Sequence, residues 1–138
     1  RNKKFDEVNI AYNFSKNVNY HHPGLSSSNY FYHPLRVCIL STKINLGLSP
    51  KLMTLGLLHN IFETTNIQKN LIKKIFGNQT TKQLEALTVN RKNEWKKNYK
   101  NNYYNKLVRS GKNVINQQNS PKLQIAPVLK KFSILFFE

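Results

Sequence analysis

The sequence is short of acidic residues. It contains 6 Asp and Glu against 22 Lys and Arg, and Asp6 is its only aspartate. A metal site that depends on two or more aspartates is therefore excluded. Biased codon usage would explain many lysines, but it would not by itself remove Asp and Glu.

Cysteine and long apolar runs are also scarce. Cys38 is the only cysteine, which excludes a disulfide framework and a zinc site made of thiolates. It lies in an apolar run, so we expect a buried, unreactive thiol. No apolar stretch approaches the roughly 20 residues that a membrane-spanning helix needs, and we predict no membrane span.

Length and charge set the broad class of the protein. The 138 residues predict one domain over 1–138, because the chain is long enough for one hydrophobic core but too short for two. The formal net charge is +16 and the pI is about 10.1. A surface this positive attracts phosphate polymers, so we expect a polyanionic partner.

Apolar residues recur at helical spacing through most of the chain, and no alternating strand pattern competes. Pro34 fits a first turn, Ser49 and Pro50 fit an N-cap followed by a first-turn proline, and Gly77 fits a helix end. We predict helices over residues 5–18, 34–47, 49–62, 66–77 and 80–89, with a loop at 26–28. The fold class is all-α, and the most apolar helix, 49–62, should be central.

Two blocks in the middle of the chain carry a resemblance to a known family. They read HPLRV and LLHNIFETT, and their histidines, His33 and His59, are 26 positions apart. The blocks resemble the HD-domain phosphohydrolases, and within them the hydrolase domain of the RelA/SpoT alarmone enzymes. The resemblance implies an HD-domain-like helical bundle.

The resemblance also implies a site. In that family, a histidine, an adjacent His-Asp pair and a late aspartate bind a divalent metal, and a Glu-Asp pair handles the attacking water. The matching residues here are His33, His59, Asn60, Pro127 and, for the water-handling pair, Glu63 and Thr64. Two imidazoles would face a dication without an anionic ligand, so we predict a vestigial site with no metal and no cofactor. The histidines would then be ordinary core residues.

A basic segment, predicted to be helical, covers residues 91–112. It has eight basic residues against Glu94, and aromatic residues recur in it at intervals of four. Phosphate contacts combined with stacking on unpaired bases are typical of sequence-tolerant RNA binding. The predicted RNA-binding residues are Arg91, Lys92, Lys96, Lys97, Lys100, Lys106, Arg109 and Lys112, with Trp95, Tyr99 and Tyr103. Alternatively, these three aromatic residues pack on the bundle.

The last part of the chain contains a polar linker and an apolar end. Residues 110–121 form the linker, which is rich in Asn and Gln. The amphipathic stretch 123–137 would be a liability if exposed. We expect it to complete the core or to dock onto another subunit.

Together these patterns predict a catalytically inactive HD-like domain that serves as a structural, RNA-contacting component of a large ribonucleoprotein. We expect this assembly to be an organellar ribosome, that of the mitochondrion, with rRNA and neighbouring proteins as partners. One alternative is a metal-dependent phosphohydrolase of the alarmone (guanosine tetraphosphate) type, using His33, His59, Asn60 and Glu63 with an unrecognised ligand. Another is a nucleotide-binding regulatory module without turnover.

Overall fold

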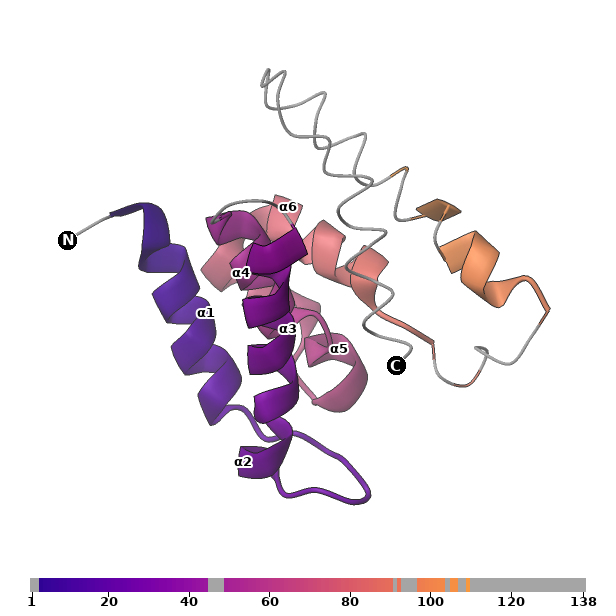
Figure 1. Ribbon diagram of the computed structural model, residues 1–138, viewed down its shortest axis with the longest axis horizontal. Coiled ribbons are helices and arrows are strands. Elements are labelled where there is room, and N and C mark those ends of the chain that lie inside the picture. The colour runs from indigo at the N-terminus through magenta and orange to yellow at the C-terminus, as the bar shows by residue number, and fades with distance from the viewer. Residues whose placement is uncertain are drawn as a thin grey trace.

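The computed structural model describes residues 3–44, 49–90, 92, 97–103, 105, 106 and 109. Within these ranges the chain forms helices joined by turns, without a strand, which confirms the all-α class. The elements in order are η1 (Lys3–Phe5), α1 (Asp6–Asn17), α2 (Ser27–Tyr30), α3 (Tyr32–Ile44), α4 (Pro50–Leu58), α5 (Ile61–Thr64) and α6 (Lys69–Leu87) (Figure 1). None of the described helices combines the length and the apolar character that crossing a bilayer requires.

Helix α4 is the centre of the bundle. It begins as predicted, because the Ser49 side chain accepts a hydrogen bond from the Leu52 amide at 3.4 Å and Pro50 occupies the first turn. Leu55 and Leu58 are completely buried. The helix packs against both α1 and α3 and also contacts α6 (Figure 1). The prediction that the most apolar helix is central is confirmed.

The helix predicted over 49–62 is interrupted. Helix α4 ends at Leu58, and Asn60 has a non-helical backbone with φ −109° and ψ 14°. The Asn60 carbonyl then accepts hydrogen bonds from the Glu63 and Thr64 amides at 3.1 and 3.0 Å, which starts the short helix α5. The apolar periodicity continues across the interruption, so periodicity alone did not reveal it.

The predicted loop at 26–28 is the start of a short helix. Ser26 caps α2 by accepting a hydrogen bond from the Asn29 amide at 3.3 Å. The Ser27 hydroxyl donates to the Val18 carbonyl at 3.0 Å and accepts from the Tyr20 amide at 2.9 Å. These bonds hold α2 against the chain that leaves α1. Helix α3 follows and begins two residues before Pro34.

Helix α6 contains a break at Gly77, where φ is 86° and ψ is 169°. This region of backbone conformation is essentially restricted to glycine. The predicted end of a helix at Gly77 is confirmed, and the two arms of α6 cover residues 69–76 and 78–87. The predicted helix end at Gly47, the linker 110–121 and the amphipathic stretch 123–137 lie outside the described residues.

Candidate functional site

The structure brings together the two histidines of the HD-like blocks. His33 lies in the first turn of α3, and His59 follows the last residue of α4. Their Nε2 atoms are 3.1 Å apart, and the two rings meet edge to face with centroids 5.0 Å apart. His59 is buried, at 4% exposure. Packing of α3 on α4 therefore creates a close imidazole pair.

Backbone contacts define how this pair shares protons. The His59 Nδ1 atom lies 2.7 Å from the Gly56 carbonyl, and a carbonyl can only accept, so Nδ1 carries a hydrogen. In neutral His59 the Nε2 atom is consequently an acceptor. His33 Nε2 then donates to it across the 3.1 Å contact.

Asn60 is a buried polar residue next to His59 in the chain. It is 3% exposed, and its Nδ2 donates to the Tyr30 hydroxyl at 2.7 Å. Its Oδ1 is buried and accepts no hydrogen bond within the described part of the chain. A buried amide oxygen without a partner costs roughly 1–3 kcal/mol, so this atom is a local source of instability beside the histidine pair.

Aromatic rings extend from the histidine pair toward the surface. The Tyr30 ring lies 5.8 Å from His33, 5.0 Å from Tyr20 and 5.2 Å from His22, measured between centroids. Burial raises the pKa of Tyr20 to about 12. Tyrosine and histidine side chains thus fill the space around the pair, which makes it part of a packed polar core.

The donor set does not fit the divalent metal that the resemblance implies. Two Nε2 atoms 3.1 Å apart could both touch one ion at about 2.0–2.1 Å. However, the described residues contain no group of three or more His, Cys, Asp or Glu that could hold a metal. Glu63, half-buried in α5, does not complete such a group. Pro127 lies outside the described residues.

The basic segment is described in part. Lys92, Lys97, Lys100, Lys106 and Arg109 are exposed, as the RNA-binding prediction requires of them. The predicted contacts Arg91, Trp95, Lys96 and Lys112 lie outside the described residues. Residues 99–103 are helical, and Asn98 before them has a positive φ of 66°.

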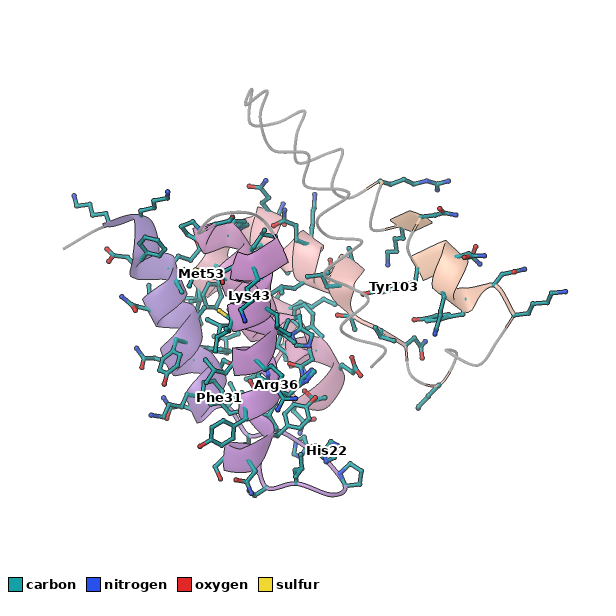
Figure 2. All side chains as sticks on the ribbon, viewed as in Figure 1. His22, Phe31, Arg36, Lys43, Met53 and Tyr103 are labelled. Carbon is teal, nitrogen blue, oxygen red and sulfur yellow. The ribbon has the colours of Figure 1, made fainter. Side chains whose placement is uncertain are left out.

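The two described tyrosines of the aromatic stripe pack on the bundle. Tyr103 is 5% exposed, and its hydroxyl donates to the Leu87 carbonyl at 2.6 Å, beside the end of α6 (Figure 2). The Tyr99 hydroxyl accepts from the Asn90 amide at 2.6 Å, and the two rings stack with centroids 6.3 Å apart. The alternative of packing, which the sequence left open, therefore describes both residues, and Tyr103 does not offer its ring to a base.

Sequence reasoning missed the lysines of α6. Lys73, Lys74 and Lys82 are exposed and extend the positive surface beyond the segment 91–112. The helical period predicts the exposure of Lys74, because it lies on the side of the helix opposite the buried Ile72 and Phe76. Tyr30, the partner of Asn60, was missed because a spacing of 30 residues carries no local signal.

Comparison with known proteins gives no relative for this chain. No protein-family model matches the sequence, and neither a search of curated proteins nor a search of solved structures finds a match.

Proposed function

We propose that the chain is a catalytically inactive HD-like domain that contacts RNA as a structural component of a large ribonucleoprotein. A mitochondrial ribosome is the assembly that we favour, with rRNA and neighbouring ribosomal proteins as partners. The observation that carries the proposal is an excess of 16 positive charges on a chain whose described residues contain no group of three or more metal-ligating side chains.

The histidine pair supports descent from a metal phosphohydrolase. Two imidazoles meet through Nε2 atoms, and the Nδ1 of His59 is fixed by a backbone carbonyl, which is the usual second contact of a metal-binding histidine. Asn60 stands beside them with an amide in the place of a carboxylate. A site with this shape, to which the described part of the chain adds no anionic ligand, supports an inactive domain over an alarmone hydrolase.

The charge distribution supports RNA as the partner. Two of the described carboxylates engage lysines: Glu7 lies 3.8 Å from Lys51, and Glu85 lies 2.5 Å from Lys69. Over the whole sequence 22 basic residues face 6 acidic ones, so the protein carries a large excess of positive charge. Such a surface is favoured when phosphates lie against it, because binding releases their counterions.

The salt dependence of RNA binding tests the electrostatic part of the proposal. Affinity for structured RNA should fall by about 10³–10⁵ between roughly 50 and 200 mM salt if the protein makes about 6–10 phosphate contacts. The triple variant Lys97→Gln, Lys100→Gln and Arg109→Gln should lower the slope of log affinity against log salt by up to about 3. Lys16→Gln and Lys43→Gln on α1 and α3 are the control. A slope near zero for the parent protein would reject RNA binding by this surface.

Co-sedimentation tests membership of an assembly. The tagged protein should travel with ribosomal particles from mitochondria in low salt and leave them in high salt. Migration with free protein at every salt concentration would reject the ribonucleoprotein assignment, even if the isolated protein binds RNA.

A further inference from the structure

Two neighbouring hollows lie between α5 and α6, away from the histidine pair. The first has a volume of about 420 Å³. Its lining includes Phe62, Lys69, Lys82, Glu85, Ala86 and Lys106. The second, about 500 Å³, is lined by side chains that include Asn66, Gln68 and Asn70. Phe62 and Lys69 line both hollows, so the two form one groove, which we name the α5–α6 groove.

The break at Gly77 brings the second arm of α6 to the first hollow. The Lys69 Nζ and Glu85 Oε1 atoms are 2.5 Å apart, although each residue is eight positions from Gly77. In one straight helix, 16 residues would separate them by about 24 Å. The two arms of α6 therefore fold back on each other, and both present side chains to the first hollow.

The first hollow is positively charged. The residues that line it within the described part of the chain include three lysines and one glutamate, a net charge of +2 when all four are ionised. Glu85 is engaged with Lys69, and Lys82 and Lys106 are the other two basic residues of this lining. They come from α6 and from residue 106 of the basic segment, so the hollow joins the two parts of the basic surface. A concave positive surface suits a phosphate group.

Phe62 supplies an aromatic side chain to both hollows of the groove. The side chain is half-buried and packs against the hydrophobic core. Aromatic side chains stack on unpaired bases, and amide side chains can form hydrogen bonds with base edges. The second hollow offers three such amides next to Phe62. Both volumes fall in the range of roughly 300–1,000 Å³ that is usual for small-ligand pockets.

We infer that the α5–α6 groove binds consecutive unpaired nucleotides of a single-stranded RNA. The base of one nucleotide packs on Phe62 and contacts the amides of the second hollow. The adjoining phosphate lies at Lys82 and Lys106. Two connected hollows that share an aromatic residue suit a chain of nucleotides better than one free nucleotide. This inference rests on the proposed RNA contact and locates part of it.

Charge reversal at the groove is the first test. The variant Lys82→Glu with Lys106→Glu is compared with Lys73→Glu and Lys74→Glu, which change the net charge equally on exposed residues of α6 outside the groove. The probe is a short fluorescent single-stranded oligoribonucleotide, and circular dichroism verifies that each variant is folded. The groove variant should bind roughly tenfold more weakly than the control variant. Equal weakening would overturn the groove and leave the proposed function intact.

Phe62 provides a second, independent test. Phe62→Leu keeps an apolar side chain against the core but removes the aromatic face, so it should weaken single-stranded RNA roughly tenfold and leave a matched RNA duplex unaffected. Ultraviolet cross-linking of a uridine-rich strand should label the peptide that contains Phe62. Equal losses of affinity for the single strand and the duplex, or cross-links only to other peptides, would overturn the assignment of the groove as the binding site. Absence of any RNA binding by the parent protein would overturn the proposed function itself.

Discussion

The Tyr20 hydroxyl donates to the Ser15 hydroxyl at 2.6 Å, in the interior of the bundle. Ser15 has a single hydroxyl hydrogen, and it is used on the Leu57 carbonyl at 2.8 Å, so Tyr20 is the donor in the first contact. Ser15 is fully buried, and Tyr20 is 4% exposed. This two-bond chain ties α1 and the turn after it to the central helix α4.

Removal of the Ser15 hydroxyl should destabilise the fold. Ser15→Ala leaves the Tyr20 hydroxyl and the Leu57 carbonyl without their buried partner, and we expect a loss of about 1–3 kcal/mol in the free energy of unfolding. Urea unfolding measures it. Ser28→Ala is the control, because Ser28 is exposed and should change stability by less than about 0.5 kcal/mol. Equal effects of the two substitutions would contradict the role of the buried hydroxyl.

Stability should fall in alkali because of Tyr20. Burial raises the pKa of Tyr20 from 10.0 to about 12, so the folded state favours the neutral phenol. The contribution of this group is fully present below pH 10 and is lost as pH rises to about 12, by an amount on the order of 3 kcal/mol. The Tyr20→Phe variant should be less stable than the parent protein near neutral pH. Between about pH 10 and 12, however, it should lose less stability than the parent. Parallel pH profiles for the two proteins would contradict this assignment.

Substitution of Gly77 should destabilise the fold because of the backbone conformation at this position. A Cβ at this position would meet no atom within 4 Å, so any cost comes from the positive φ of 86°. We expect Gly77→Ala to lower the free energy of unfolding by about 1–3 kcal/mol. Gly24→Ala is the matched control, because its Cβ would make only an ordinary contact, 3.6 Å from His22. A chemically synthesised D-alanine at position 77 should restore stability, because its mirror-image configuration favours positive φ.

Cys38 should react slowly in the folded protein. The thiol is 5% exposed, and burial raises its pKa to about 11 from the usual 9.0. At about pH 8 this shift alone lowers the thiolate fraction roughly 100-fold. Alkylation by iodoacetamide, followed by mass spectrometry, should therefore be at least that much slower than in urea. Similar rates in both conditions would show that the region around Cys38 opens readily.

A carboxylate at position 60 should create metal affinity. Asn60→Asp adds an anionic ligand beside the two imidazoles, and we expect the affinity for manganese to rise roughly tenfold or more over that of the parent protein. Thermal shift titrations measure the change, with the exposed Asn66→Asp as the control. The parent protein should not hydrolyse guanosine tetraphosphate with manganese present. Tight manganese binding or turnover by the parent would contradict the inactive-domain proposal.

Local sequence signals predicted the parts of the fold that depend on single residues. Ser49 and Pro50 start α4, and Gly77 ends the first arm of α6, because cap and turn conformations restrict the residues that fit them. The break after Leu58 was missed because its causes are contacts made in three dimensions, such as that between Asn60 and Tyr30. Helix α2 was missed because it is only four residues long.

The candidate sites show the same division. The spacing of His33 and His59 along the chain does not by itself predict that they are in contact. Only the resemblance implied that they belong to one site. The α5–α6 groove was not predicted, because it depends on the reversal that places Lys69 beside Glu85. The exposed lysines of the basic segment were predicted from the sequence, whereas the packing of Tyr103 depends on where α6 ends.

The bond between Tyr103 and Leu87 also has a mechanical consequence. Because Tyr103 belongs to the core cluster, the helical turn at 99–103 is anchored to the end of α6 and does not behave as a loose tail. Lys100 in this turn therefore keeps a fixed position relative to Lys82 of the second arm. Under the proposed RNA contact, a flexible nucleic acid would adjust its path to the spacing of these cations, and the entropy cost of ordering would fall mainly on the nucleic acid.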